Sequence, residues 1–332
     1  MKKVVWGVLS TAKIGVKQVI PAMQLSPWCD MRAIASRSLP AAQAAADALG
    51  VPKAYGSYEE LIADPEIEAI YNPLPNHLHI PLTLQAARAG KHVLCEKPFS
   101  LTAAEAEQLR EVAGRVHIME AFMVRFHPQW QRVRELVRAG RIGTPRAVQV
   151  FFSYFNDDPG NIRNQADIGG GALFDIGCYA IVAGRDLFEA DPARVIALVD
   201  RDPALGTDRT TSALADFGSG RQLGFTVSTQ AQRYQRLNIV GTSGRIEVLI
   251  PFNAPQGEAT TILVDTTGAL DGSGVERETL QPCDQYTLQG EAFSRAVRAE
   301  VMLPYGLDDA VMNMRIIDAL LRSEHSGRWE AP

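Results

Sequence analysis

The stretch H-V-L-C-E-K-P-F-S, residues 92–100, joins a short apolar strand to two charged side chains. His92–Cys95 has the length and composition of a buried parallel strand, and Glu96 and Lys97 follow it directly. Pro98 halts the run and allows a cis peptide bond. Ligands of parallel sheets bind beyond the carboxyl ends of the strands, which is where Glu96 and Lys97 would lie. Taken alone, these residues are better explained by a structural Glu–Lys pair, so the rest of the chain must decide.

The chain up to Phe122 alternates short apolar runs with helical patterns. Strands are predicted at Val4–Leu9, Met31–Ala35, Ala69–Leu74, His92–Cys95 and Val116–Met119, and helices at Ile14–Leu25, Ala41–Leu49, Tyr58–Ala63, Pro81–Ala89 and Ala103–Ala113. Parallel strands need crossover connections, so this alternation predicts a parallel sheet with helices on both faces. We therefore expect a Rossmann dinucleotide-binding domain over residues 1–122.

Beyond Phe122 the sequence changes to strand-like runs with few helices between them. Strands are predicted at Arg146–Phe155, Val195–Val199, Ser212–Phe217, Gln222–Ser228, Leu237–Val240, Arg245–Leu249 and Thr261–Val264. Helices are predicted at Pro128–Ala139, from the glycine run Gly169–Gly171 through Leu187, at Thr287–Ala299 and at Leu307–Ser323. The predicted fold class is α/β, in which residues 123–332 form an α+β domain on a large, mainly antiparallel sheet.

Composition describes an ordinary soluble globular protein. The chain has 332 residues, of which 46% are hydrophobic and 21% charged, and a net charge of -5 gives no footprint for nucleic acid or an anionic membrane. No apolar run is expected to reach the ~20 residues that span a bilayer. The four cysteines are far apart, which favours reduced thiols in a cytoplasmic protein and no metal site.

A degenerate nucleotide-binding motif follows the first predicted strand. In G-V-L-S-T-A-K-I-G, Gly7–Gly15, the residues Ser10, Ala12 and Gly15 take the three glycine positions of G-x-G-x-x-G. Small residues there let the backbone approach a pyrophosphate at a helix N-terminus. An ordinary strand–helix turn explains the motif equally well in isolation, but its place at the first crossover favours a cofactor. The expected contacts are Gly7, Ser10, Thr11, Ala12, Lys13 and Ile14.

The end of the second strand indicates which dinucleotide binds. An NAD-binding fold normally places Asp or Glu here for the ribose 2′-hydroxyl, whereas this chain has Ser36 and Arg37. An arginine can bond a 2′-phosphate that a carboxylate would repel, so NADP is predicted over NAD. The alternative is that Arg37 is a solvated loop charge.

Three spaced motifs resemble those of the Gfo/Idh/MocA oxidoreductases: N-P-L-P-N-H-L-H (72–79), E-K-P (96–98) and G-G-G-A-L-F-D-I-G-C-Y (169–179). M-E-A-F-M-V-R-F-H-P (119–128) is most similar to the branch of dihydrodiol dehydrogenases and NADP-dependent D-xylose dehydrogenases. The resemblance implies a Rossmann domain followed by a substrate-binding domain with an open sheet. That sheet often forms the dimer face in relatives, so a homodimer or homotetramer is expected.

The resemblance also implies the catalytic residues. Lys97 would be the catalytic lysine, and Asp175 and Tyr179 would complete the site from one face of a helix, since they are four residues apart. We expect Tyr179 to be the acid/base, Lys97 to lower its pKa and Asp175 to orient the substrate, although Lys97 and Tyr179 could exchange roles. This hypothesis requires the amine and the phenol to converge over the reactive carbon of the nicotinamide.

Further contacts follow from the same resemblance. Additional cofactor contacts are expected from Asn72, Leu74, Pro75, Asn76, His79, Glu96 and Arg125, besides Ser36, Arg37 and Lys97. A helix cap and a surface histidine would explain Asn76 and His79 equally well without the family. Substrate contacts are expected from Arg163, Asn164 and Tyr154, although the strand pattern favours packing for Tyr154. A cation at Arg125 favours sugar hydroxyls over an arene diol, or contacts the cofactor.

These observations predict an NADP-dependent oxidoreductase that acts on a sugar-like hydroxyl or carbonyl. An aldose oxidised at C1, of the D-xylose or D-glucose type, is the specific expectation. The alternatives are a trans-dihydrodiol dehydrogenase, a 3-ketosugar reductase and, in a different class, a non-catalytic NADP-binding sensor.

Overall fold

The computed structural model describes residues 2–332, which divide into two compact units. The first unit contains the chain up to Met123 together with Asp284–Val311, and the second contains Val124–Cys283 and Met312–Pro332. The domain boundary expected after residue 122 stays a prediction. By its contacts, Asp284–Val311 belongs with the first unit.

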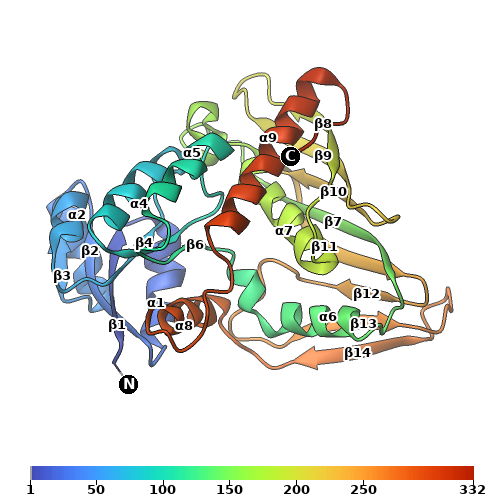
Figure 1. The fold of residues 1–332 in the computed structure, drawn as a ribbon, viewed down its shortest axis with the longest axis horizontal. Helices are drawn as coiled ribbons and strands as arrows, with labels where there is room; N and C mark the ends of the chain where they lie inside the picture. Colours follow the sequence, from blue (N-terminus) through green and yellow to red (C-terminus); the bar gives the residue numbers. More distant parts are fainter. Residues whose placement is uncertain (1) are drawn as a thin grey trace. The chain divides into compact units, whose positions relative to one another are not determined.

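The first unit is built on a six-stranded sheet with the order β3-β2-β1-β4-β5-β6 (Figure 1). Its strands are β1 (Val4–Leu9), β2 (Cys29–Ala35), β3 (Lys53–Tyr55), β4 (Ala69–Asn72), β5 (His92–Cys95) and β6 (Ile118–Glu120). All neighbouring pairs are parallel. This is the strand order of the dinucleotide-binding fold, in which the direction of winding reverses between β1 and β4. The predicted Rossmann sheet is confirmed.

Helical segments lie between these strands in the chain: η1 (Gly15–Val19), α1 (Ile20–Gln24), α2 (Leu39–Leu49), α3 (Tyr58–Ala63), η2 (Asn76–Leu78), α4 (His79–Arg88), α5 (Ala103–Glu107) and η3 (Gln108–Val112). The helix α8 (Gln285–Val297) comes after the second unit's strands and packs with this unit. Side chains fix several starts: the Thr102 hydroxyl accepts from the Glu105 amide at 3.2 Å, and the Glu105 carboxylate accepts from the Leu101 amide at 3.0 Å. The helix α8 is held to β1 by a buried hydrogen bond, which the Trp6 indole N–H donates to Ser294 Oγ at 3.1 Å.

The second unit is built on an eight-stranded sheet with the order β14-β13-β12-β11-β7-β10-β9-β8. Its strands are β7 (Pro145–Phe155), β8 (Arg194–Arg201), β9 (Asp208–Asp216), β10 (Gln222–Ser228), β11 (Gln230–Gly241), β12 (Arg245–Val248), β13 (Thr260–Asp265) and β14 (Val275–Leu280). Within the described residues β7 and β10 run parallel and every other neighbouring pair is antiparallel. The predicted, mainly antiparallel sheet is thus confirmed.

One face of this sheet is covered by helices. The remaining helical segments are η4 (Met123–Phe126), α6 (Pro128–Arg138), η5 (Ile162–Asn164), η6 (Ala166–Ile168), η7 (Leu173–Gly177), α7 (Cys178–Phe188) and α9 (Leu307–Ser326). Gly184 of α7 lies so close to β10 that a Cβ would meet Leu223 Cδ2 at 2.9 Å. Val148, Val150 and Phe152 of β7 are buried, whereas the alternating Gln149 and Phe151 are exposed. Alternation therefore leaves the second face of the sheet open.

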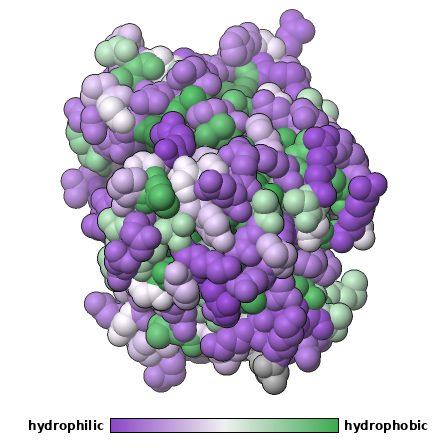
Figure 2. All heavy atoms as spheres, turned by 90° about the vertical axis from the view of Figure 1, so that its left-hand side faces the viewer, coloured by the Kyte–Doolittle hydropathy of each residue, from purple (hydrophilic) through white to green (hydrophobic). Residues whose placement is uncertain are grey.

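The segment Ala166–Phe188 is long and apolar enough to cross a membrane by length and composition alone, although the sequence suggested no such run. Of its most apolar window, 61% is buried inside the protein, as in the core helix of a soluble protein. The molecular face drawn in Figure 2 is mainly hydrophilic, with hydrophobic side chains scattered over it.

Candidate active site

The turn after β1 has an unusual backbone at Ser10, which takes a positive φ of 85°. Glycine adopts this conformation freely, whereas a serine does so at a cost, and such positions concentrate at functional sites. The Ser10 amide donates to the Ala35 carbonyl at 2.8 Å, and its hydroxyl accepts from the Ala12 amide at 2.9 Å. The π-helical turn η1 follows. Ser10 therefore builds the tight turn that a glycine builds in the standard motif.

The candidate cofactor residues of the first unit follow the carboxyl ends of β1, β2, β4 and β5. Because these strands are parallel, the loops share one edge of the sheet. Leu74 is buried at this edge, and the two cations Lys13 and Arg37 are exposed. The other residues are half-buried: Thr11, Ala12, Ile14, Ser36, Pro75 and Asn76. Gly7 has a packing role, since a Cβ there would meet Leu61 Cδ2 of α3 at 2.5 Å.

Asn72 and His79 tie the loop after β4 together. The Asn72 amide donates to the His79 carbonyl and to Thr83 Oγ1, both at 3.2 Å. His79 is buried, with Nδ1 2.8 Å from the Pro98 carbonyl oxygen and Nε2 2.7 Å from that of Leu74. Burial lowers the pKa of His79 to about 4, so the ring is neutral at physiological pH and has one N–H to donate. The imidazole thus lies between the loop after β4 and the loop that carries Lys97, and it donates its one N–H to one of the two carbonyls.

The E-K-P segment is anchored by a tyrosine that sequence reasoning missed. The Tyr71 hydroxyl donates to Glu96 Oε1 at 2.7 Å, and burial raises the pKa of Tyr71, with the Glu96 charge acting in the same direction. Glu96 and Lys97 are half-buried, and the Lys97–Pro98 bond is cis. A donor that holds Glu96 in place also fixes the backbone from which Lys97 projects.

In the second unit, Asp175 is the centre of a hydrogen-bonded cluster. Its Oδ2 accepts from the Tyr154 hydroxyl at 2.6 Å, and its Oδ1 accepts from Arg163 Nε at 3.0 Å. Burial and the neighbouring Asp175 raise the pKa of Tyr154, and Asp175 raises the pKa of Arg163. The Arg163 side chain keeps 44% of its surface exposed, against 14% for Asp175. The cluster therefore presents a carboxylate flanked by a phenol and a solvent-accessible guanidinium.

Tyr179 lies on α7, just beyond the π-helical turn η7 that contains Asp175. The residue is 6% exposed, and its ring contacts two phenylalanines, with centroid distances of 5.9 Å to Phe152 and 5.4 Å to Phe252. Short π segments are frequent at functional sites, and this protein has one after β1 and one here. The aromatic contacts fix the orientation of the Tyr179 ring.

Two other expected contacts have structural partners. Arg125 belongs to the second unit, is 3% exposed and forks the carboxylate of Asp186, with Nε and an Nη each 3.1 Å from an oxygen. The buried Asn164 amide donates to the Asp158 carbonyl at 2.8 Å and so closes the loop that carries Arg163. Within residues 2–332, no group of three or more His, Cys, Asp or Glu is placed to hold a metal ion.

The glycine run 169–171 brings the parts of the second-unit cluster together. A Cβ on Gly170 would meet the carbonyl oxygens of Arg163 and Gln165, each at 2.7 Å. Gly171 has a φ of +120°, and a Cβ there would overlap Oδ1 of Asp208. Only glycines let the Arg163 loop, the Asp175 helix and the start of β9 approach this closely. Sequence reasoning missed Asp208, because no spacing links it to the other motifs.

Comparison with known proteins identifies the family. The family model for an oxidoreductase family with an NAD-binding Rossmann fold matches residues 4–124, and the model for the GFO/IDH/MocA C-terminal domain matches residues 130–247. The chain belongs to the Gfo/Idh/MocA family. It is an NAD(P)-dependent oxidoreductase.

Individual relatives cover nearly the whole chain. An uncharacterized oxidoreductase of Rhizobium meliloti is 45% identical over 99% of both chains. A D-xylose 1-dehydrogenase (NADP(+)) of Haloferax volcanii is 41% identical over 97% of this chain and 98% of its own. The crystal structure of a 3-ketoreductase from Actinomadura kijaniata with NADP and TDP-benzene has a TM-score of 0.90 at 29% identity, covering 97% of this chain and 98% of that one. The similarity to these relatives therefore extends over nearly the whole chain.

Proposed function

We propose that this protein transfers a hydride between NADP and a sugar-like hydroxyl or carbonyl, most specifically the C1 hydroxyl of an aldose of the D-xylose or D-glucose type. The observation that carries the proposal is the Asp175 cluster, in which a carboxylate is flanked by Tyr154 and an exposed Arg163. Such a group of acceptors and forked donors suits a polyol. The 41% identical D-xylose 1-dehydrogenase supports the same choice.

The proposed roles follow from which atoms are engaged. Substrate hydroxyls would donate to the carboxylate of Asp175, which also accepts from Tyr154 on Oδ2 and from Arg163 on Oδ1. Tyr179 would exchange a proton with the reacting oxygen, and the Lys97 ammonium would lower the pKa of that phenol by its charge. Lys97 could instead transfer the proton itself, with Tyr179 donating a hydrogen bond. Both versions require the two groups to act on one substrate.

The chain fits a dinucleotide in its first unit. The positive φ of Ser10 shapes a tight turn before a helix, and Thr11, Ala12, Lys13 and Ile14 would surround the pyrophosphate. When bound, the nicotinamide supplies the hydride acceptor or donor. Arg37 is exposed at the end of β2, where it would bond a 2′-phosphate. Ser36, Asn76, Glu96 and Lys97 would contact the remaining cofactor, whereas Asn72, Leu74 and His79 would act through the loop that they hold.

The test is an assay of the purified protein with NADP and a panel of aldoses, polyols and diols, followed by the absorbance of the reduced cofactor. We expect NADPH formation with an aldose and a weaker reaction with NAD. Oxidation of arene diols alone would favour a trans-dihydrodiol dehydrogenase. Reduction of 3-ketosugars alone would favour the 3-ketosugar reductase, a reading that the structural likeness to the Actinomadura kijaniata protein supports. Tight NADP binding with no turnover would favour the sensor.

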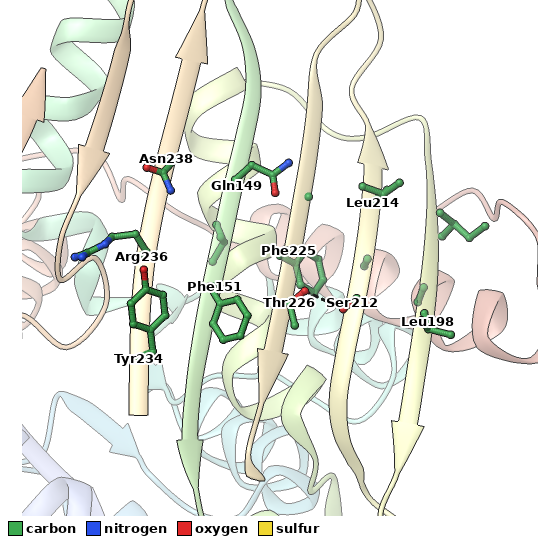
Figure 3. A pocket seen from close by; sticks show the side chains of 15 residues that line it. Gln149, Phe151, Leu198, Ser212, Leu214, Phe225, Thr226, Tyr234, Arg236 and Asn238 are labelled. Atoms are coloured by element: carbon green, nitrogen blue, oxygen red, sulfur yellow. Dashed lines mark hydrogen bonds between the residues drawn. The ribbon is translucent and has the colours of Figure 1, made fainter. Parts of the chain in front are cut away.

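A second copy of the chain is proposed to cover the open face of the eight-stranded sheet, giving a homodimer or homotetramer. Figure 3 shows this face, where Phe151, Leu198, Leu214 and Tyr234 project among polar side chains around a hollow of about 620 Å³. Leu198 is 77% exposed, an unfavourable position for a large apolar side chain in a monomer. Sedimentation of the wild type and of Leu198→Lys tests this, and a wild-type monomer would exclude it. A cytoplasmic location is proposed because none of the four cysteines, all within the described residues, forms a disulfide.

A further inference from the structure

Asp208, at the start of β9, is a buried carboxylate that the proposed chemistry does not use. It is 4% exposed. Its Oδ2 accepts from the Leu173 amide at 2.7 Å and from the Thr211 hydroxyl at 2.6 Å. Leu173 is the first residue of η7, so this carboxylate caps the helix that contains Asp175 and continues to Tyr179.

The second oxygen of Asp208 is also in contact with the turn before this helix. Gly171 has a positive φ, and any side chain there would overlap Oδ1 of Asp208. One carboxylate thus bonds the first helical amide and abuts the glycine that turns the chain into the helix. The sequence must keep residue 171 free of a Cβ for Asp208 to reach this position.

The turn that Asp208 holds is joined to both sides of the Asp175 cluster. The Gly171 amide donates to the Arg163 carbonyl at 2.8 Å, and the Gly171 carbonyl accepts from the Asp175 amide at 3.0 Å. A shift of Gly171 would therefore move the backbone of Arg163 and that of Asp175 together. These are the two residues that form the 3.0 Å ion pair at the centre of the cluster.

We propose that Asp208 is a positioning residue for the reaction: its ionised carboxylate fixes the first turn of the helix that presents Asp175 and Tyr179 to the substrate. This inference rests on the proposed function. A charged acceptor bonds an amide more strongly than a neutral one, and a negative charge is favourable at a helix N-terminus. Protonation of Asp208 weakens both effects and so loosens this turn locally, although burial makes the neutral carboxyl the favoured form for the fold as a whole.

The surroundings of Asp208 place its change of charge within the range of ordinary assays. Burial raises the pKa of Asp208 to about 6, against the lowering effect of its two hydrogen bonds. The charged and titratable groups that face it are Arg201 of β8, Glu324 of α9 and Tyr154 of β7. Arg201 and Glu324 pair with each other through two contacts of 2.7 Å, so their effects on Asp208 largely cancel. Asp208 therefore gains its charge as the pH rises through about 6.

The experiment compares the wild type with Asp208→Asn and with a matched control, Asp216→Asn. Asp216 lies at the other end of the same strand and likewise accepts from a backbone amide, that of Gly218 at 2.9 Å. We expect the wild-type kcat at saturating NADP and substrate to fall on the acid side with an apparent pKa near 6. D208N should lose about tenfold in kcat at pH ~8 and lack this acid limb, because asparagine does not titrate. D216N should keep the wild-type profile. An unchanged kcat and acid limb in D208N would overturn the proposal.

A second readout does not depend on turnover. Amide hydrogen exchange over residues 169–180 should be faster in D208N than in wild type at pH ~8, most clearly at Leu173 and Asp175, and unchanged in D216N. If the wild type turns over no substrate, the proposed function fails while this measurement still decides the role of Asp208. Equal exchange in all three proteins would contradict the positioning role.

Discussion

The Tyr154 hydroxyl donates a 2.6 Å hydrogen bond to Oδ2 of Asp175, which joins the end of β7 to the helix that carries Tyr179. Tyr154 is therefore part of the candidate site and not only a packing residue of the strand. Removal of this donor leaves the bond from Arg163 to Asp175 in place.

Tyr154→Phe should lower kcat/KM about tenfold, because a hydrogen bond to a charged group contributes roughly 1.5–3 kcal/mol and Arg163 retains part of the orientation. The same bond stabilises the folded protein, so the melting temperature should also fall by a few degrees. The matched control is Tyr234→Phe, since Tyr234 lies on the open sheet face and is 46% exposed. Equal losses in both variants would show that the Tyr154–Asp175 bond has no specific role.

Arg37→Gln should weaken NADP binding by roughly 10- to 100-fold and leave NAD binding unchanged, because only NADP has the 2′-phosphate. Calorimetric titration with each cofactor measures this. Arg88→Gln removes another exposed arginine, one that pairs with Glu111, and should alter neither affinity. Equal loss of NAD and NADP affinity in R37Q would mean that Arg37 does not bind the 2′-phosphate.

Asp208→Asn should stabilise the protein at neutral pH. The folded-state pKa of about 6 exceeds the ordinary 3.8, so the stability contributed by this carboxyl is full below pH ~3.8 and is lost as the pH rises through 6. Asparagine does not titrate, and D208N should gain up to about 3 kcal/mol in the free energy of unfolding at pH ~7.5, reduced by its weaker cap. Asp216 has a lowered pKa from Gly218 and Arg194, so D216N should lose stability there. Urea unfolding at two pH values distinguishes the signs.

Buried histidines should make the free energy of unfolding fall as the pH drops from about 6.5 towards 4. Burial lowers the pKa of His79, His92 and His127 to about 4, so the unfolded chain binds more protons than the folded chain in this window. Each such histidine contributes a slope of about 1.4 kcal/mol per pH unit. His79→Gln should lower that slope by about one such increment, whereas His325→Gln, at an exposed position, controls for the loss of a histidine. An unchanged slope in H79Q would contradict the neutral, buried state of His79.

The sequence predicted those elements best that have a strong apolar pattern. β1, β5, β10 and α3 have their predicted bounds, because buried runs flanked by turn residues leave few alternatives. β3 and β14 were not predicted: Lys53–Tyr55 is short and half-buried, and V-E-R-E-T-L has polar residues on both faces. The predicted helix Ile14–Leu25 begins instead with the π turn η1.

The candidate site was less accessible from sequence than the fold. The resemblance of the motifs to the family implied Lys97, Asp175 and Tyr179, but long-range hydrogen bonds leave no periodic signal in the sequence. Tyr71 and Asp208 act 25 and 35 residues away from their partners Glu96 and Leu173. Such partners emerge only when the strands and loops are placed in space.

The most direct test of the central claim is a double-mutant cycle on turnover with Lys97→Met, Tyr179→Phe and the double variant, all with NADP binding verified. We predict that K97M alone loses several kcal/mol of transition-state stabilisation, each ~1.4 kcal/mol being tenfold in rate. The double variant should turn over only slightly more slowly than the less active of the two single variants. Near-wild-type turnover in K97M, or fully additive losses in the double variant, would contradict an amine and a phenol acting on the same substrate atom.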